Sequence, residues 1–195
     1  MLNVTSDTKQ LTHALKEWAV AVAALEAGET IALLRKGGIR EAKGNFQVKY
    51  RQVWLYPTYE HQKPELLKPK YAAKVSPVES GWHPETIPIS ICAEITEIIT
   101  LSDRDIIAAL QPYHIWNEQM ISDRLKWQSD RPLFLLLLKA YNLPKPQIIP
   151  FDRAYRGCKS WIDLVKPIST ETLIPILDNN VYNQKVSEII NLVNS

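Results

Sequence analysis

Two adjacent cations stand directly before a glycine pair in the sequence RKGG, which begins at Arg35. A glycine pair lets backbone N–H groups and the side chains of Arg35 and Lys36 converge on one anion, such as a phosphate or a carboxylate. The apolar run 31–34 before them predicts a strand, so both cations would stand at a strand end. The simpler alternative is a hairpin turn whose flanking cations face water. Arg35 and Lys36 are therefore candidates for anion binding.

A second group of cations follows in an alternating segment. Apolar residues at positions 46, 48 and 50 alternate with polar ones, among them Lys49 and Arg51. Because this period is typical of a half-buried strand, both cations would share its outer face. Ten basic and three acidic residues lie between Arg35 and Lys74, a net charge of +7 in a chain of net charge +2. Such a segment is typical of a protein with a polyanion partner, although an ordinary lysine-rich surface has the same composition.

The sequence YEHQ at residues 59–62 brings a phenol, a carboxylate, an imidazole and an amide together just after this strand. His61 could act as a general base oriented by Glu60, with Glu17 from the first expected helix as a second proton-transfer group, or it could hydrogen-bond a base edge. Gln62 could hydrogen-bond a nucleic acid. The alternative is a structural or exposed histidine, because the neighbouring side chains of Glu60 and His61 point apart on an extended chain and need not interact.

The sequence YRGCKSW, residues 155–161, mixes two cations and two aromatic side chains around a glycine. Tyr155 or Trp161 could stack on a base while Arg156 or Lys159 contacts a phosphate. The alternative is that Trp161 belongs to the core and Gly157 only permits a turn. Cys158 has no histidine near it in the sequence, which disfavours a catalytic cysteine.

Several classes of site and protein have no support in the sequence. Cys92 and Cys158 lie outside any CxxC or Cys/His pattern and the four histidines are widely spaced, so we expect no metal site. No Gly-rich nucleotide-binding motif follows a strand, and we expect no cofactor. The N-terminus lacks a signal-peptide pattern, and the longest apolar run, 133–138, is far shorter than the roughly 20 residues that span a bilayer. We therefore expect a cytoplasmic protein without membrane contact and leave its oligomeric state open.

The hydrophobic pattern predicts the elements that position these residues. We expect a helix over 11–27 ended by Gly28, strands over 30–35 and 45–56, and a long proline-rich loop over 57–88. A strand over 87–101, helices over 103–110 and 116–127, and a buried strand from 132 to 141 follow. Helices over 169–177 and 183–193 close the chain. This order indicates an α+β fold, with one domain over 1–168 and a C-terminal helical appendage over 169–195 packed on it.

Several separated segments carry a resemblance to a known family. HALKEWAVAVAALEAG, IALLRKGGI, WLYPTYEHQ, YNLPKP and YRGCKSW, in this order, resemble the bacterial family of the domain of unknown function 1802, over about residues 13–164. The family has no assigned activity, and some relatives carry a fused restriction-endonuclease-type domain. The resemblance therefore implies a link to DNA defence and a nuclease partner.

The expected order of elements near the N-terminus resembles a second family. A helix, Gly28 and a strand ending in Arg35 resemble the start of PUA-like and ASCH-type domains, which implies a mixed-sheet β-barrel flanked by helices that binds RNA or modified bases. The chain lacks the usual Gly-x-Lys followed by Glu and Arg, and Glu29 stands where that family favours lysine.

Our leading hypothesis is a non-catalytic module that binds DNA or RNA. The residues that would carry it are Arg35, Lys36, Lys49, Arg51, Gln62, Tyr155, Arg156, Lys159 and Trp161. A second hypothesis is an enzyme for a small anionic or nucleotide substrate, in which Glu17 and His61 transfer protons and Arg35 holds the anion. A third is a scaffold or interaction protein without catalysis.

Overall fold

The computed structural model describes residues 10–36, 47–127, 129 and 131–195 of the chain. In these residues the strands are β1 (Gln10–Trp18), β2 (Ala32–Arg35), β3 (Gln52–Thr58), β4 (Thr86–Leu101), β5 (Leu133–Pro150), β6 (Trp161–Ser169) and β7 (Ile174–Pro175). The α-helices are α1 (Ala19–Glu26), α2 (Pro69–Ala72), α3 (Arg104–Ala109), α4 (Glu118–Lys126) and α5 (Asn179–Val193). Short 3-10 helices lie at η2 (Pro64–Leu66), η3 (Gln111–Tyr113) and η4 (Arg153–Tyr155).

The described strands form one seven-stranded sheet in the order β2-β5-β4-β3-β1-β6, and β7 pairs with β5. The pair β1 and β3 is parallel, whereas the other neighbours are antiparallel. The predicted α+β class with a mixed sheet is confirmed.

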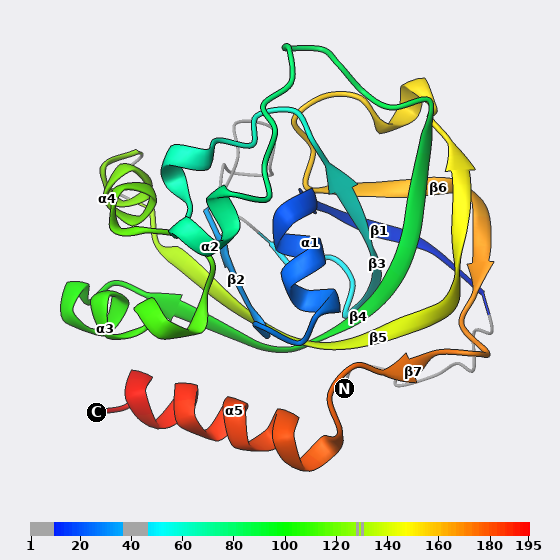
Figure 1. Ribbon diagram of the computed structural model, residues 1–195. Helices are drawn as coiled ribbons and strands as arrows, with labels where there is room; N and C mark the ends of the chain where they lie inside the picture. The colour runs from blue at the N-terminus through cyan, green and yellow to red at the C-terminus, as the bar shows by residue number, and fades with distance from the viewer. Residues whose placement is uncertain (1–9, 37–46, 128, 130) are drawn as a thin grey trace.

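The long strands β4 and β5 shape the molecule. Their register shifts between Ile89 and Ile91 and again between Ile95 and Glu97, and such bulges bend a strand. Figure 1 shows both strands sweeping past α1, so that the curved sheet wraps around this helix. The apolar run 133–138 in β5 pairs with β2 on one side and β4 on the other, which explains why it is apolar on both faces.

The expected helix over 11–27 is half wrong. Residues 10–18 form β1, which pairs with β3 on one side and β6 on the other, and α1 begins only at Ala19. Because both edges of β1 are hydrogen-bonded, sheet pairing outweighs the helical spacing of the apolar residues. The predicted helix end is confirmed: Gly28 has a φ of 65°, and its N–H and that of Glu29 donate to carbonyls of the last turn.

Two further expectations in the N-terminal half need correction. The second strand begins at Gln52, and the described residues 47–51 before it are not in a strand. The proline-rich segment 57–88 contains η2, α2 and the start of β4. It also places Leu67 and Tyr71 in the core, whereas most of its residues from 73 to 86 are exposed, so it is a surface segment anchored at a few positions.

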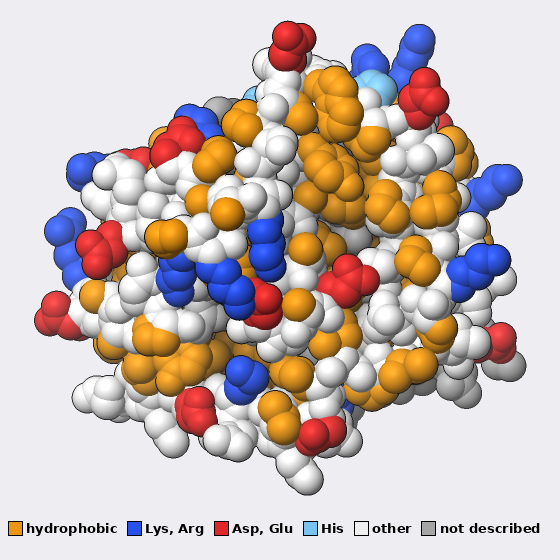
Figure 2. Space-filling view, viewed as in Figure 1, with side chains coloured by type: hydrophobic (Ala, Val, Ile, Leu, Met, Phe, Trp, Pro, Cys, Tyr) orange, Lys and Arg blue, Asp and Glu red, His pale blue; other side chains and the backbone are white. Residues whose placement is uncertain are grey.

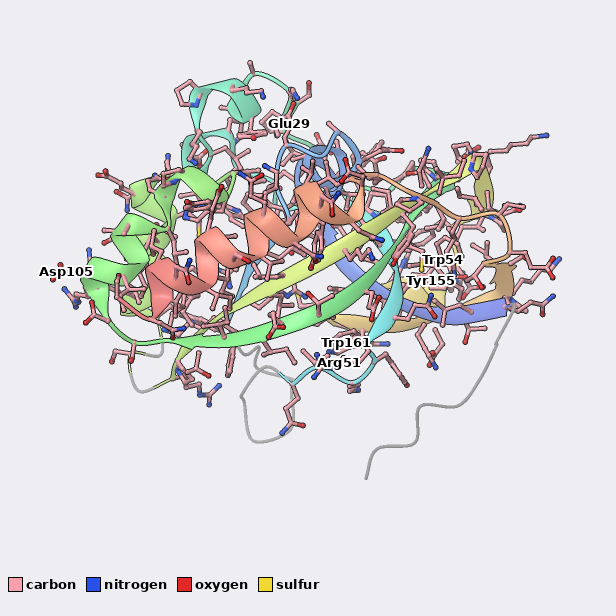
Figure 3. The ribbon with its side chains drawn as sticks, turned by 90° about the horizontal axis from the view of Figure 1, so that it is seen from below. Glu29, Arg51, Trp54, Asp105, Tyr155 and Trp161 are labelled. Carbon is pink, nitrogen blue, oxygen red and sulfur yellow. The ribbon has the colours of Figure 1, made fainter. Side chains whose placement is uncertain are left out.

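The C-terminal region ends in one helix. The expected helix over 169–177 is wrong, because these residues contain the end of β6 and the short strand β7. The last helix begins earlier than expected, with Asp178 as its N-cap. Figures 1 and 3 show α5 lying across the outer side of β4 and β5. The hydroxyls of Tyr182 and Thr96 lie 2.5 Å apart and link the helix to β4.

Candidate functional site

Lys16 and Glu17 are neighbours in β1, so their side chains leave opposite faces of the sheet. Glu17 meets Arg35 at the end of β2. Lys16 instead reaches the turn that follows η4. The residues that could do chemistry therefore form two separate groups.

The first group is a buried ion pair. Arg35 Nη1 donates to Glu17 Oε2 at 2.9 Å, and the two side chains are only 15% and 6% exposed. The other carboxylate oxygen accepts the backbone N–H of Trp18. Arg124 from α4 lies close by: burial lowers its pKa, repulsion from Arg35 lowers it further, and attraction to Glu17 opposes both. Lys36 Nζ donates to the backbone oxygen of Arg124 at 2.5 Å. This group ties β1, β2 and α4 together.

The structure thus uses both cations of the expected anion cradle inside the fold. Lys36 is 6% exposed, and Arg35 is held by a buried carboxylate. Gly37 and Gly38 lie outside the described residues. Ligand binding by Arg35 and Lys36 stays a prediction, and their observed contacts are structural.

The second group forms around Lys16. Its ammonium donates to the backbone oxygens of Tyr155 and Gly157 at 2.8 and 2.9 Å. Burial lowers the pKa of Lys16, Cys158 and Glu60 raise it, and Lys159 lowers it, so these groups are near. Lys16 fixes the backbone of the turn, whose Gly157 has a φ of 86°. Lys16 is not among the predicted site residues; on a strand, its position on the face opposite Glu17 is the one signal that could have identified it.

Glu60 and His61 join the same region. The carboxylate of Glu60 accepts the N–H of Gly81 at 2.6 Å and the hydroxyl of Ser80 at 3.2 Å, and the first of these bonds is the main cause of its lowered pKa. His61 has a φ of 67°, which is rare for a residue with a side chain. Its Nε2 lies 3.4 Å from the Glu60 carboxylate, in a largely exposed position. The carboxylate therefore fixes the loop 80–81 and stands beside the imidazole.

An aromatic and basic surface lies next to these contacts. Trp82 is 46% exposed, with its ring edge-on to Tyr59 at 6.0 Å between centroids. His83 stacks on Phe151 at 3.4 Å, and a guanidinium nitrogen of Arg156 lies 3.1 Å from its Nε2. Figure 2 shows hydrophobic side chains gathered near Lys, Arg and His side chains at the top of this view, where the loop from α2 to β4 crosses the molecule in Figure 1. We define the aromatic–basic patch as Tyr59, His61, Trp82, His83, Phe151, Arg156 and Lys159.

Three other residues predicted to bind nucleic acid, Lys49, Arg51 and Gln62, lie outside the aromatic–basic patch. Lys49 is exposed, and the guanidinium of Arg51 donates to the backbone oxygens of residues 95 and 96 at the β4 bulge. Gln62 is buried, and its side-chain oxygen accepts the N–H of Val20 in the first turn of α1. Arg51 and Gln62 therefore complete backbone hydrogen bonding within the fold.

The two aromatic residues predicted to stack on bases are buried. Tyr155 packs edge-on against Tyr56, and its hydroxyl accepts the N–H of Val165. Figure 3 shows it inside the body of the molecule. The indole N–H of Trp161 donates to the backbone oxygen of Gln47. In this arrangement neither the Tyr155 ring nor the Trp161 ring offers a face to a base. Trp161 belongs to the core, which was the alternative to base stacking.

The basic segment does not form one cationic stripe. Lys70 and Lys74 both approach Glu29, at 3.1 and 3.6 Å. The ammonium of Lys68 donates to the backbone oxygens of Gln111 and His114. Arg40 and Lys43 lie outside the described residues. Internal bonds thus use much of the charge that the sequence places between Arg35 and Lys74.

The two candidate catalytic residues, Glu17 and His61, do not share a site. Glu17 is buried against Arg35, whereas His61 is exposed beside Glu60. Within the described ranges, no group of three or more His, Cys, Asp or Glu residues could hold a metal ion. No described helix is long and apolar enough to cross a membrane.

Comparison with known proteins agrees with the family resemblance. The family described as domain of unknown function (DUF1802) matches residues 14–188. No curated protein matches the chain. Among solved structures, the ASCH protein of Zymomonas mobilis is similar at 14% identity and a TM-score of 0.44, covering 90% of this chain and 93% of that one. A single-residue variant of the same protein is 12% identical with a TM-score of 0.46, covering 93% and 97%. At these values the likeness carries no argument about function.

Proposed function

The chain belongs to the DUF1802 family, and from the geometry of its surface we propose that it binds single-stranded nucleic acid on the aromatic–basic patch. The observation that carries this proposal is Trp82, a half-exposed indole edge-on to Tyr59, in the loop whose next residue, His83, meets Arg156. An exposed aromatic ring offers its face to any base, and flanking cations follow the phosphates. The restriction-linked role and the nuclease partner still depend on the family resemblance alone.

The hydrogen bonds of the patch support this assignment because they hold its loops in place. Glu60 ties the loop 80–81 to the end of β3, and Lys16 ties the turn 155–157 to β1. Arg156 joins the two loops through His83. A platform held before binding loses less conformational entropy when a ligand arrives.

The charge of the patch favours stacking over phosphate contacts as the main source of affinity. Arg156 and Lys159 are exposed, but so are Glu79 and Glu85 in the neighbouring loop. Two phosphate contacts on a single strand predict a slope of about −1.4 for log K against log salt concentration. This value is shallower than the slope expected for an extended basic surface.

The test is fluorescence anisotropy with a labelled oligothymidylate, its RNA counterpart and a duplex of equal length. We expect the single strands to bind more tightly than the duplex. Trp82→Ala should weaken binding about tenfold, since loss of one stacked base costs about 1–3 kcal/mol. Trp82→Phe should restore part of the affinity. Arg156→Ala and Lys159→Ala should each reduce the salt slope by about 0.7.

Matched control variants lie on other elements. Trp127 follows α4 and is exposed to a similar degree, and Lys185 lies on α5. Trp127→Ala and Lys185→Ala should leave affinity and salt slope unchanged. Equal weakening by Trp82→Ala and Trp127→Ala, or no binding to any of the three nucleic acids, would refute the proposal.

A further inference from the structure

A cavity of about 270 Å³ lies between α3, η3 and α4, on a part of the fold that the aromatic–basic patch does not include. Its apolar lining includes Ile107 from α3 and Ile121 and Leu125 from α4. Arg104, Glu118 and Lys126 contribute charged side chains. Figure 1 shows α3 and α4 at the same end of the molecule. The volume is close to the lower end of the range for small-molecule sites in proteins.

Two residues that line this cavity carry unsatisfied polar atoms. The side-chain oxygen of Gln111 and both ring nitrogens of His114 are buried and have no hydrogen-bond partner among the described residues. His114 is only 3% exposed, and its ring lies near the backbone of Trp116 without a hydrogen bond of good geometry. Buried polar atoms are nearly always hydrogen-bonded in native proteins, so three such atoms at one cavity indicate a missing partner.

The backbone beneath these side chains is well held, so a loose segment does not explain the unsatisfied atoms. Lys68 donates its ammonium to the backbone oxygens of Gln111 and His114. The N–H of Lys68 also donates to Ile115 at 3.0 Å, and Leu67 pairs with Trp116 in an isolated bridge. The backbone contacts therefore fix both residues in the lining of the cavity.

The protonation state of His114 defines what the partner must offer. Burial, followed by the nearby Lys68 ammonium, lowers the pKa of His114 to about 4. At neutral pH the ring is uncharged and has one N–H donor and one acceptor nitrogen. The oxygen of Gln111 can only accept. A partner must therefore both donate and accept hydrogen bonds, as an amide group does.

We propose that this cavity binds a small molecule with an apolar body and an amide-type edge, independently of the nucleic-acid site. The ligand N–H would donate to the oxygen of Gln111, and the ligand carbonyl would accept from the ring of His114. The apolar body would lie against Ile107, Ile121 and Leu125.

Benzamide is the probe for this site, and benzoate is its matched control. The two have the same ring, but benzoate has no N–H donor and adds a negative charge. Binding is followed by NMR through the isoleucine methyl signals and the histidine ring signals, which are few because the chain has four histidines. We expect benzamide at millimolar concentration to shift the signals of Ile107, Ile121 and His114, and benzoate to bind at least tenfold more weakly.

Two variants separate the polar contacts from the space that the ligand fills. Gln111→Leu removes the acceptor and should weaken benzamide binding about tenfold. Ala108→Trp places a large side chain at an exposed position of the lining without changing Gln111 or His114, and it should abolish binding. Lys185→Ala, on α5 and outside the lining of the cavity, should leave benzamide binding unchanged.

Three results would overturn the proposal. The first is no shift of the cavity signals, which means that water alone satisfies the polar atoms. The second is benzamide binding that survives both Gln111→Leu and Ala108→Trp. The third is benzoate binding as tight as that of benzamide, which would indicate attraction by the cations Arg104 and Lys126.

Discussion

Lowering the pH from 7 to 4 should destabilise this protein, and His114 should account for a measurable part of the loss. The imidazole is almost completely buried, and Lys68 holds a positive charge near it. Both effects disfavour the imidazolium, so the pKa in the folded protein is lowered from 6.5 to about 4. In the unfolded chain the ring returns to its ordinary pKa.

The sign and the size follow from proton linkage. Between pH 6.5 and pH 4 the unfolded state binds a proton at His114 that the folded state does not bind. The free energy of unfolding therefore falls as the pH falls through this window and levels off below about pH 4. A shift from 6.5 to 4 corresponds to about 3 kcal/mol, at 1.36 kcal/mol for each pH unit. This value is a large share of the free energy of unfolding of a typical domain, which is roughly 5–15 kcal/mol.

Urea unfolding at a series of pH values measures the effect. Carboxylates such as Glu29 and Glu60, whose pKa values are lowered in the folded state, also lose their stabilising contribution in acid. Subtracting the curve of His114→Gln from that of the wild type removes these shared terms. The difference should change by about 3 kcal/mol between pH 7 and pH 4.

The control variant is Trp127→Ala, because Trp127 is exposed and its side chain has no titratable group. Its curve should run parallel to that of the wild type. If the curves of wild type and His114→Gln are also parallel, burial does not hold the ring neutral, and the single donor and single acceptor assigned to His114 at neutral pH are wrong.

Three other predictions concern the fold around the sites. Glu17→Gln should lower the free energy of unfolding by about 3 kcal/mol, because it leaves buried guanidinium groups without their carboxylate; a loss below about 1 kcal/mol in urea unfolding would contradict this. Gly28→Ala should cost about 2 kcal/mol in the same assay, because its φ is 65° and an added Cβ would lie 2.9 Å from Leu177 Cδ2. A thiol-reactive dye should label the exposed Cys158 in the native protein. It should label Cys92, whose pKa burial raises to about 12, only after unfolding; native labelling that survives Cys158→Ser would refute this.

Local patterns in the sequence correctly indicated several elements. The alternation over 87–101, the apolar run 133–138 and the glycine after Ala27 predicted a strand, a buried strand and a helix end. These features depend on the geometry of residues that are close together in the chain, so the spacing of residue types in the sequence is enough to predict them. The segment 10–18 was misread because its partners β3 and β6 are distant in the chain, and pairing with them outweighs local helical spacing.

The sequence by itself determined the α+β class, the family motifs and the types of residue available for chemistry. Only the tertiary structure decided which charges meet. It buried Arg35 against Glu17, used Arg51 and Gln62 to complete backbone hydrogen bonds, and brought His83 beside Arg156. The physical reason is that the electrostatic energy of a side chain depends on its burial and on neighbours far away in the sequence, and a charge count along the chain contains neither.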